Sequence, residues 1–385
     1  MDGEAKRLDA RILSFIRKHA DQPASDKNFE TLALQIFDYQ FRKNTNYRKF
    51  CLIEGKAPGK VKKWQEIPAM PTAGFKELVL ATFPIKKAVK VFKTSGTTHE
   101  NRGAHFFDTL KLYEAAIIPP FRQYLLPATK TRHQGVGGSA RDVWRTSAGL
   151  RDFLFCFLMS SPKESPNSSL SHMMGVVNRV FAKNKGKFYV QKDQIQYENL
   201  LKDLKQTRKK VFILSTAFAL KAFLDYLRNR KISLNLPSGS RLMETGGFKG
   251  RTKEVSKDKL YAECNKTLGI DRNYCVSEYG MTELSSQFYD TTLRDKVSGS
   301  KREPFKEGPA WIRTLVIDPK TGKEAAKGKR GVLRHFDLAN RGSVLAIQTE
   351  DLGRRASEGF ELLGRASGAE LRGCSLSYEE FLTSP

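Results

Sequence analysis

Two short, wholly apolar runs at residues 153–159 and 211–214 constrain the fold of this chain more than any other feature. Uninterrupted apolar runs of this length are typical of strands that are buried on both faces of a sheet. The second run is followed by apolar residues at helical spacing over residues 218–228. Buried strands that alternate with helices predict an α/β protein.

The segment before these runs predicts a different mixture of elements. Apolar residues recur near helical spacing at Leu8, Ile12 and Ile16 and again over residues 32–41, so the N-terminal region is expected to be helical. Residues 75–91 favour short strand pieces.

Three further segments lie beside or between the two apolar runs. Residues 108–123 favour a helix that is interrupted at the two adjacent prolines, 119 and 120. Residues 131–147 and 161–171 are polar and are expected to form loops.

The pattern changes from Trp311 onward. Residues 311–319 and 331–336 predict antiparallel strands joined by a turn at residues 320–323, and residues 344–347 predict a third strand. A small β-unit is therefore expected to follow the α/β core.

Composition excludes several classes of protein. Apolar residues make up 39% of the 385 residues, which is typical of a globular chain. No run approaches the ~18 apolar residues of a membrane span, so no integral membrane association is expected. The charged N-terminus is unlike a signal peptide, and this difference favours a cytoplasmic location.

The five cysteines are scattered without a Cys-x-x-Cys pair, so we expect reduced thiols and neither a disulfide framework nor a zinc site.

The formal net charge of +26 favours anionic partners. The lysines and arginines form short, dispersed clusters, and no RNP motif, zinc finger or helix-turn-helix signature accompanies them. We interpret the charge as a solubility trait and keep nucleic-acid binding as a minority alternative.

Residues 91–103 carry a turn rich in hydroxyls and glycine, followed by a cation at Arg102. Backbone N–H groups and hydroxyls in such a turn suit the oxygens of a triphosphate. The sequence lacks the Gly-Lys-Ser/Thr ending of a Walker loop, and a polar surface turn is the alternative. The candidate nucleotide-binding residues of this turn are Thr94, Ser95, Gly96, Thr97 and Thr98.

Four later segments also carry residues of chemical interest. In chain order they are Glu-Thr-Gly-Gly-Phe-Lys-Gly at 244–250 with Gly246 and Gly247, Ser-Glu-Tyr-Gly-Met-Thr-Glu at 277–283, Thr-Glu-Asp-Leu-Gly at 349–353, and Gly-Phe-Glu-Leu-Leu-Gly-Arg at 359–365. With the turn at 91–103, they resemble the motifs of the adenylate-forming superfamily in sequence and in order. The resemblance implies the large α/β N-terminal domain of those enzymes, with ATP and Mg²⁺ as cofactors.

The resemblance also implies a role for each matching residue. Tyr279 would stack near adenine, Thr282 would contact the α-phosphate, and Glu283 would coordinate magnesium. Asp351 would accept hydrogen bonds from the ribose hydroxyls, and Arg365 would lie near the ribose and phosphates. The double glycine would let the backbone approach adenine, with a plain structural turn as the alternative.

The short C-terminal part narrows the resemblance. Only residues 366–385 follow Arg365, Arg102 stands in place of the usual loop lysine, and the tail ends in Leu-Arg-Gly-Cys-Ser-Leu-Ser at 371–377. These features resemble the acyl-protein synthetases, the family of the LuxE component of bacterial luminescence. We therefore expect a helical region at 1–74 within the main domain, an adenylation core at 75–365, and a tail at 366–385 that carries the acyl-accepting cysteine.

In that family a fatty acid is activated as acyl-AMP, moved to a cysteine of the synthetase, and passed to a reductase partner. Cys374 occupies the matching position, and nearby Arg372 would lower the pKa of its thiol. His172 would gate the acyl pocket and orient the carboxylate, with a plain histidine at a helix start as an equal alternative. Either Lys249 or Arg251 is a candidate to replace the lysine of the missing C-terminal domain.

Two other functions stay open at this point. One is a ligase that delivers the acyl group to an external thiol such as coenzyme A, which the short C-terminus disfavours. The other is a non-catalytic partner that keeps the nucleotide-binding fold, to which Arg102 and the missing domain give some weight.

Overall fold

The computed structural model describes residues 2–94, 102–127, 152–246 and 255–366. Within these ranges the helices are α1 (Gly3–Lys18), α2 (Asp26–Lys43), α3 (Thr45–Ile53), α4 (Gly74–Glu77), α5 (Lys111–Leu125), α6 (Ser169–Val180), α7 (Tyr197–Gln206), α8 (Ala217–Asn229), α9 (Lys257–Leu268) and α10 (Thr292–Ser298). Short 3₁₀ turns occur at η1 (Trp64–Glu66), η2 (Ile85–Lys87), η4 (Arg272–Tyr274) and η5 (Leu338–Asn340).

The described strands are β1 (Met70–Pro71), β2 (Lys90–Lys93), β3 (Ala104–Phe107), β4 (Phe153–Ser160), β5 (Lys187–Gln191), β6 (Gln194–Ile195), β7 (Lys210–Thr216), β8 (Arg241–Thr245), β9 (Cys275–Tyr279), β10 (Phe288–Asp290), β11 (Lys306–Glu307), β12 (Ile312–Ile317), β13 (Arg330–Asp337), β14 (Ala346–Ala356) and β15 (Gly359–Arg365). Thirteen of them form one sheet in the order β12-β13-β14-β15-β11-β10-β9-β8-β7-β4-β5-β6, with β1 paired to β14. Strands β2 and β3 form a separate hairpin.

The parallel part of the large sheet consists of β5, β4, β7, β8 and β9. Its central strands are almost wholly buried because helices cover both faces. On one face, α7, α8 and α9 pack their apolar sides on the sheet, and α5 and α6 do so on the other. This arrangement confirms the predicted α/β class and both apolar strands, and α8 confirms the helix expected over 218–228.

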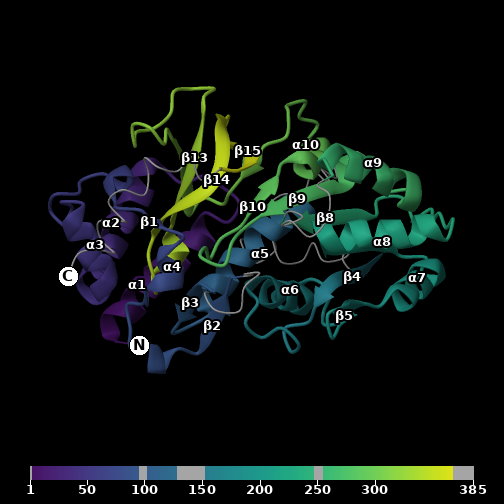
Figure 1. Ribbon diagram of the computed structural model, residues 1–385, viewed down its shortest axis with the longest axis horizontal. Coiled ribbons are helices and arrows are strands. Elements are labelled where there is room, and N and C mark those ends of the chain that lie inside the picture. Colours follow the sequence, from purple (N-terminus) through teal and green to yellow (C-terminus); the bar gives the residue numbers. More distant parts are fainter. Residues whose placement is uncertain (1, 95–101, 128–151, 247–254, 367–385) are drawn as a thin grey trace, which may run out of the picture.

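The antiparallel strands predicted after Trp311 are also present, but they do not form a separate sheet. β12 pairs with β13, as expected, and the third strand, β14, pairs with β13 but runs over Ala346–Ala356 rather than over 344–347. β15, which the pattern did not predict, joins them through β11 and β10 to the parallel strands. The carboxyl ends of β8 and β9 are therefore held in the same sheet as β14 and β15 (Figure 1).

The N-terminal helices α1, α2 and α3 confirm the helical start of the chain and lie at the end of the molecule opposite α7 (Figure 1). Polar side chains satisfy the free N–H groups at their starts, with Asp2, Ser25 and Asn44 as N-caps. None of the helices in the described part of the chain has the length and apolar character needed to cross a membrane.

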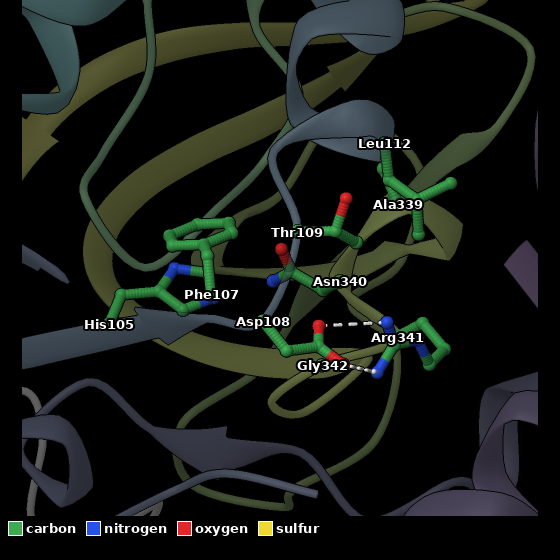
Figure 2. A pocket seen from close by; sticks show the side chains of 9 residues that line it. All are labelled: His105, Phe107, Asp108, Thr109, Leu112, Ala339, Asn340, Arg341 and Gly342. Carbon is green, nitrogen blue, oxygen red and sulfur yellow. Dashed lines mark hydrogen bonds and ion pairs between the residues drawn. The ribbon is translucent and has the colours of Figure 1, made fainter. Parts of the chain in front are cut away.

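A buried arginine connects α1 to the core. The guanidinium of Arg341 donates to both carboxylate oxygens of Asp9, at 2.7 and 3.1 Å, and to both oxygens of Asp108, at 2.9 and 3.1 Å. Arg341 is 1% exposed. Figure 2 shows the Asp108 carboxylate facing the guanidinium beside a small hollow, with His105 nearby. This paired network accounts for the polar lining of the hollow.

Two predictions were wrong for the part of the chain that precedes β4. Residues 75–91 contain α4 and η2, and a strand begins only at Lys90. Pro119 and Pro120 lie inside a continuous α5. Each proline removes one backbone hydrogen bond, but Pro120 and Phe121 are buried in the core, and this packing outweighs the local preference.

Two loop boundaries also differ from the prediction. Residues 169–171 are the first turn of α6, because Ser168 caps that helix by accepting a hydrogen bond from the N–H of Ser171. A turn does form at the predicted residues 320–323, closed by a hydrogen bond from the N–H of Asp318 to the carbonyl of Lys323 at 2.8 Å, but β13 begins only at Arg330. Residues 131–147 lie outside the described part of the chain.

Candidate functional site

The candidate phosphate-binding turn joins the two strands of the β2–β3 hairpin. At its base, the N–H of Gly103 donates to Thr94 Oγ1 at 2.9 Å, and the N–H of Thr94 donates to the carbonyl of Gly103 at 2.9 Å. A side chain at Gly103 would lie 3.3 Å from the backbone oxygen of Phe75, so only glycine fits without a shift. Arg102 is exposed. Ser95, Gly96, Thr97, Thr98 and His99 lie outside the described residues.

The hairpin contacts the Tyr-Gly-Met-Thr-Glu segment through one buried histidine. His105 Nδ1 lies 2.9 Å from the backbone oxygen of Thr282, 177 residues further along the chain. A carbonyl oxygen only accepts, so Nδ1 carries the proton. Burial lowers the pKa of His105 to about 4, which keeps the ring neutral near pH 7. This contact places the base of the turn beside Thr282.

A second contact joins the same segment to the Asp351 motif. The hydroxyl of Tyr279 donates to Asp351 Oδ2 at 2.8 Å and lies 3.3 Å from His335 Nε2. The Tyr279 ring packs among the rings of Phe288, His335 and Phe360. Asp351 therefore holds its carboxylate at the carboxyl end of β9.

Arg365 lies near the other oxygen of Asp351. Its Nε is 3.7 Å from Asp351 Oδ1, and its side chain is 76% exposed whereas that of Asp351 is 14% exposed. The guanidinium is thus free to turn toward an anion in solvent, while the carboxylate is held by the protein.

The buried environment of Glu283 suits a cation. Glu283 is 7% exposed, and burial raises its pKa to about 7, with the negative charge of Asp351 acting in the same direction. Arg365 and Lys76 lower that pKa, but to a smaller extent. A divalent cation would offset the cost of the buried charge. Mg²⁺ commonly binds one or two carboxylates together with substrate phosphates, so Glu283 fits such a site.

Asp337 organises the backbone just after Glu283. Its Oδ2 accepts from the N–H groups of Ser285 and Ser286 at 2.9 and 2.8 Å, and its Oδ1 accepts from the Ser286 hydroxyl at 2.8 Å. Asn340 adds a hydrogen bond from Nδ2 to the carbonyl of Glu283 at 2.8 Å. These bonds fix the chain on which Glu283 is presented.

The turn at Gly246 directly follows β8, beside β9. Gly246 has a φ of +74°, which favours glycine, and a side chain there would meet open space. In the residue before it, the Thr245 hydroxyl donates to the buried carboxyl group of Glu278 on β9. Gly246 therefore lies next to the strand that ends in Tyr279, while Gly247, Lys249 and Arg251 lie outside the described residues.

His172 lies in the first turn of α6 and packs on the face of the β2–β3 hairpin that carries Phe92 and His105. Its ring packs against Phe92 at 5.4 Å and Tyr113 at 5.8 Å between centroids. Nε2 lies 3.1 Å from Glu114 Oε1. Burial lowers the pKa of His172 below its usual value, although Glu114 opposes this shift. The residue thus borders the aromatic cluster between α5, α6 and the sheet.

Comparison with known proteins assigns the chain to a family. Residues 134–383 match the family described as acyl-protein synthetase, LuxE. The chain belongs to this family. Two relatives, both named long-chain-fatty-acid–luciferin-component ligase, come from Aliivibrio fischeri and Vibrio harveyi. They are 22% and 21% identical and cover 90% of this chain, and the chain covers 87% and 86% of them.

Solved structures of adenylate-forming ligases share the fold. A 2-hydroxyisobutyryl-CoA ligase in its postadenylation state superposes with a TM-score of 0.61 at 14% identity, over 89% of this chain and 68% of the other. An open conformation of the same ligase gives a TM-score of 0.58 at 14% identity, over 88% and 69%. The expected adenylate-forming fold and the expected family, an AMP-forming acyl-protein ligase, are thus confirmed.

Four of the five cysteines of this LuxE family member are buried thiols. Cys51, Cys156, Cys264 and Cys275 are all inaccessible, and burial raises the pKa of each. For Cys51, Cys156 and Cys275 that pKa reaches about 12. A thiol in this state is a poor nucleophile at neutral pH. Cys374 lies outside the described residues.

The structure brings together the motif residues that it describes, and it adds others. Thr94, Tyr279, Thr282, Asp351 and Arg365 are linked through the contacts given above. The contacts of His105, Asp337 and Asn340 were missed from the sequence, because each depends on a partner far along the chain. The polar string Asp-Leu-Ala-Asn-Arg at 337–341, set between two apolar runs, was the available signal.

Proposed function

We propose that the chain uses ATP and Mg²⁺ to activate a long-chain fatty acid as acyl-AMP and then transfers the acyl group to its own Cys374. The observation that carries the first half is the contact of His105 with the carbonyl of Thr282 at 2.9 Å. It brings the base of the candidate phosphate turn beside the segment that would meet the α-phosphate. Membership of the LuxE family and the names of its two relatives support a fatty acid as the substrate.

In the first step, an oxygen of the fatty acid carboxylate attacks the α-phosphorus of ATP, and pyrophosphate leaves. Two anions must approach each other, so the site must supply positive charge and hydrogen-bond donors. Arg102 and the Thr282 hydroxyl would face the phosphates, and Asp351 would fix the ribose. Magnesium bound at Glu283 would neutralise charge on the phosphate oxygens.

In the second step, the thiolate of Cys374 attacks the carbonyl carbon of acyl-AMP. The C–S bond forms as the bond to the phosphate oxygen breaks, so AMP leaves and the acyl group remains as a thioester. Burial of the other four cysteines supports Cys374 as the acceptor. His172, at the border of the aromatic cluster, would orient the carboxylate end of the acid.

The remaining parts of the proposal concern organisation and partners. Residues 75–365 would form the adenylation core, with residues 1–74 packed against it and residues 366–385 as the tail that carries Cys374. The acyl group would then pass to a reductase or another acceptor, in the cytoplasm. The contact of Asp9 on α1 with Arg341 supports the view that the N-terminal helices are part of the main domain.

Incubation with ATP, Mg²⁺ and radiolabelled tetradecanoate tests both steps. Wild type should release pyrophosphate and acquire a label that hydroxylamine removes, while Cys374→Ser should release pyrophosphate but stay unlabelled. Cys51→Ala, which removes a buried thiol, serves as the control and should label normally. AMP formation with no labelled protein, followed by labelling of added coenzyme A, would favour the external-thiol ligase. Absence of pyrophosphate release would favour the alternative that the chain is a non-catalytic partner that keeps the nucleotide-binding fold.

A further inference from the structure

An exposed surface that is both cationic and apolar lies where the chain enters the β2–β3 hairpin. We call residues 85–90, Ile-Lys-Lys-Ala-Val-Lys, the cationic rim. Val89 is 63% exposed and Ile85 is 49% exposed, unusually high values for branched aliphatic side chains. The η2 turn brings them close in space, because the N–H of Ala88 donates to the carbonyl of Ile85.

The rim has no acidic residue to balance its lysines. Residues 78–94 contain four lysines and no aspartate or glutamate. Lys86 and Lys87 are exposed, and in the described part of the chain neither forms an ion pair. Their charges therefore face the solvent, beside the exposed side chains of Ile85 and Val89.

The rim is also continuous with the candidate acyl site. Its last residue, Lys90, begins β2, and the side chain of Phe92 two residues later packs against His172. The β2–β3 hairpin lies at the edge of the molecule (Figure 1). The rim therefore ends two residues before Phe92, which belongs to the aromatic cluster that His172 borders.

We propose that the cationic rim docks the protein on an anionic lipid bilayer, from which it takes its fatty acid. Exposed aliphatic side chains enter the boundary between headgroups and acyl chains, while flanking lysines pair with anionic headgroups. The backbone of a nucleic acid would match the lysines but would gain nothing from Ile85 and Val89. The docking itself stands alone, whereas the uptake of fatty acid rests on the proposed function.

Co-sedimentation with lipid vesicles tests the docking without ATP or fatty acid. Full-length protein should bind vesicles of phosphatidylcholine containing about one third phosphatidylglycerol at roughly 0.1 M salt, and bind pure phosphatidylcholine weakly. Lys86→Gln with Lys87→Gln should weaken partitioning about 10- to 30-fold, since each lysine near an anionic surface contributes about fivefold. Ile85→Asp with Val89→Asp should weaken it about tenfold or more.

Two matched controls lie elsewhere on the surface. Lys320→Gln with Lys323→Gln removes two exposed charges from the β12–β13 connection, and Leu363→Asp removes an aliphatic side chain that is 39% exposed on β15, far from β2 in Figure 1. Both should bind vesicles as wild type does. Equal binding by the rim variants and wild type would overturn the proposal. So would tight binding of a DNA duplex that depends on Lys86 and Lys87 but not on Ile85 and Val89.

The uptake step has its own readout. Pyrophosphate release from tetradecanoate presented in anionic vesicles should fall in the rim variants, while release with soluble octanoate should match wild type. Vesicle binding without any pyrophosphate release would sink the proposed function and leave the docking intact. Pyrophosphate release with octanoate, by a protein that does not bind vesicles, would contradict the docking but not the proposed function.

Discussion

The hydroxyl of Tyr279 donates a hydrogen bond to Asp351 Oδ2 across 2.8 Å, and so joins two motifs that lie 72 residues apart. The bond is half-buried at the carboxyl end of β9, and it holds the carboxylate that we assign to the ribose of ATP. Asp351 Oδ1 lies 3.7 Å from Nε of the exposed Arg365, so its second oxygen faces a cation. The aromatic ring of Tyr279 packs against Phe288, His335 and Phe360, and its hydroxyl is the group that contacts Asp351.

Tyr279→Phe should therefore weaken ATP binding more than it weakens the fold. The ring remains in its aromatic cluster, but Asp351 loses one hydrogen bond, and we expect the KM for ATP to rise about 5- to 10-fold. Stability should fall by about 1 kcal/mol. Tyr289→Phe is the matched control, because the Tyr289 hydroxyl is buried without a hydrogen-bond partner in the described part of the chain. It should leave the KM unchanged and the stability equal or higher.

Glu283→Gln should stabilise the protein while abolishing adenylation. The pKa of Glu283 is raised from 4.5 to about 7 by burial, so its ionised form costs roughly 3 kcal/mol in the folded state. Because the folded pKa is the higher one, this cost is absent below about pH 4.5 and complete above about pH 7. Urea unfolding should show a gain for the variant that grows between about pH 4.5 and pH 7 and stays constant above that range. An equal gain at every pH would contradict this origin.

The same carboxylate predicts the pH dependence of the wild-type reaction. Magnesium needs the ionised form of Glu283, so pyrophosphate release at limiting Mg²⁺ should be lost as the pH falls through about 7. Because the metal favours the ionised carboxylate, raising the Mg²⁺ concentration should shift the midpoint to lower pH. Initial rates across pH 5.5–8.5 at several Mg²⁺ concentrations check both statements. A midpoint that does not move with Mg²⁺ would remove Glu283 from the metal site.

Sequence patterns predicted the parts of this fold that are encoded locally. The runs at β4 and β7 are apolar throughout because helices cover both faces of those strands, and such runs are visible in one sequence. The motif strings at 277–283 and 349–353 are equally visible, because their residues are contiguous. The continuous α5 was not predictable by the same means, since burial of Pro120 and Phe121 overrides the local effect of proline.

The long-range hydrogen bonds within the candidate site could not be predicted from the sequence either. The partner of His105 is a backbone carbonyl 177 residues away, and nothing about either residue alone marks the pair. Asp337 likewise serves two N–H groups about fifty residues before it. A single sequence shows that such polar residues exist but does not show which distant group each one satisfies.

Arg341→Met should be among the most damaging substitutions where helix α1 meets the core. It would leave the carboxylates of Asp9 and Asp108 buried without their shared partner, at a cost of about 3–5 kcal/mol. Arg42→Met is the matched control: its ion pair to Glu4 also connects α1 and α2, its pair to Asp38 lies within α2, and both pairs are exposed. Loss of those pairs should cost less than about 1 kcal/mol. Urea unfolding midpoints compare the two, and equal losses would contradict the assigned role of Arg341.

Alkylation of the native protein should distinguish Cys374 from every other cysteine. Cys51, Cys156, Cys264 and Cys275 are buried with raised pKa values, so neither access nor thiolate formation favours their reaction. Brief treatment with iodoacetamide at neutral pH should therefore add a single group, located at Cys374 by peptide mass spectrometry. Prior incubation with ATP, Mg²⁺ and tetradecanoate should block that addition, and hydroxylamine should restore it. In urea all the cysteines should react, which controls for reagent quality. Labelling of Cys374 that ATP and fatty acid leave unchanged would argue that the acyl group goes to an external thiol.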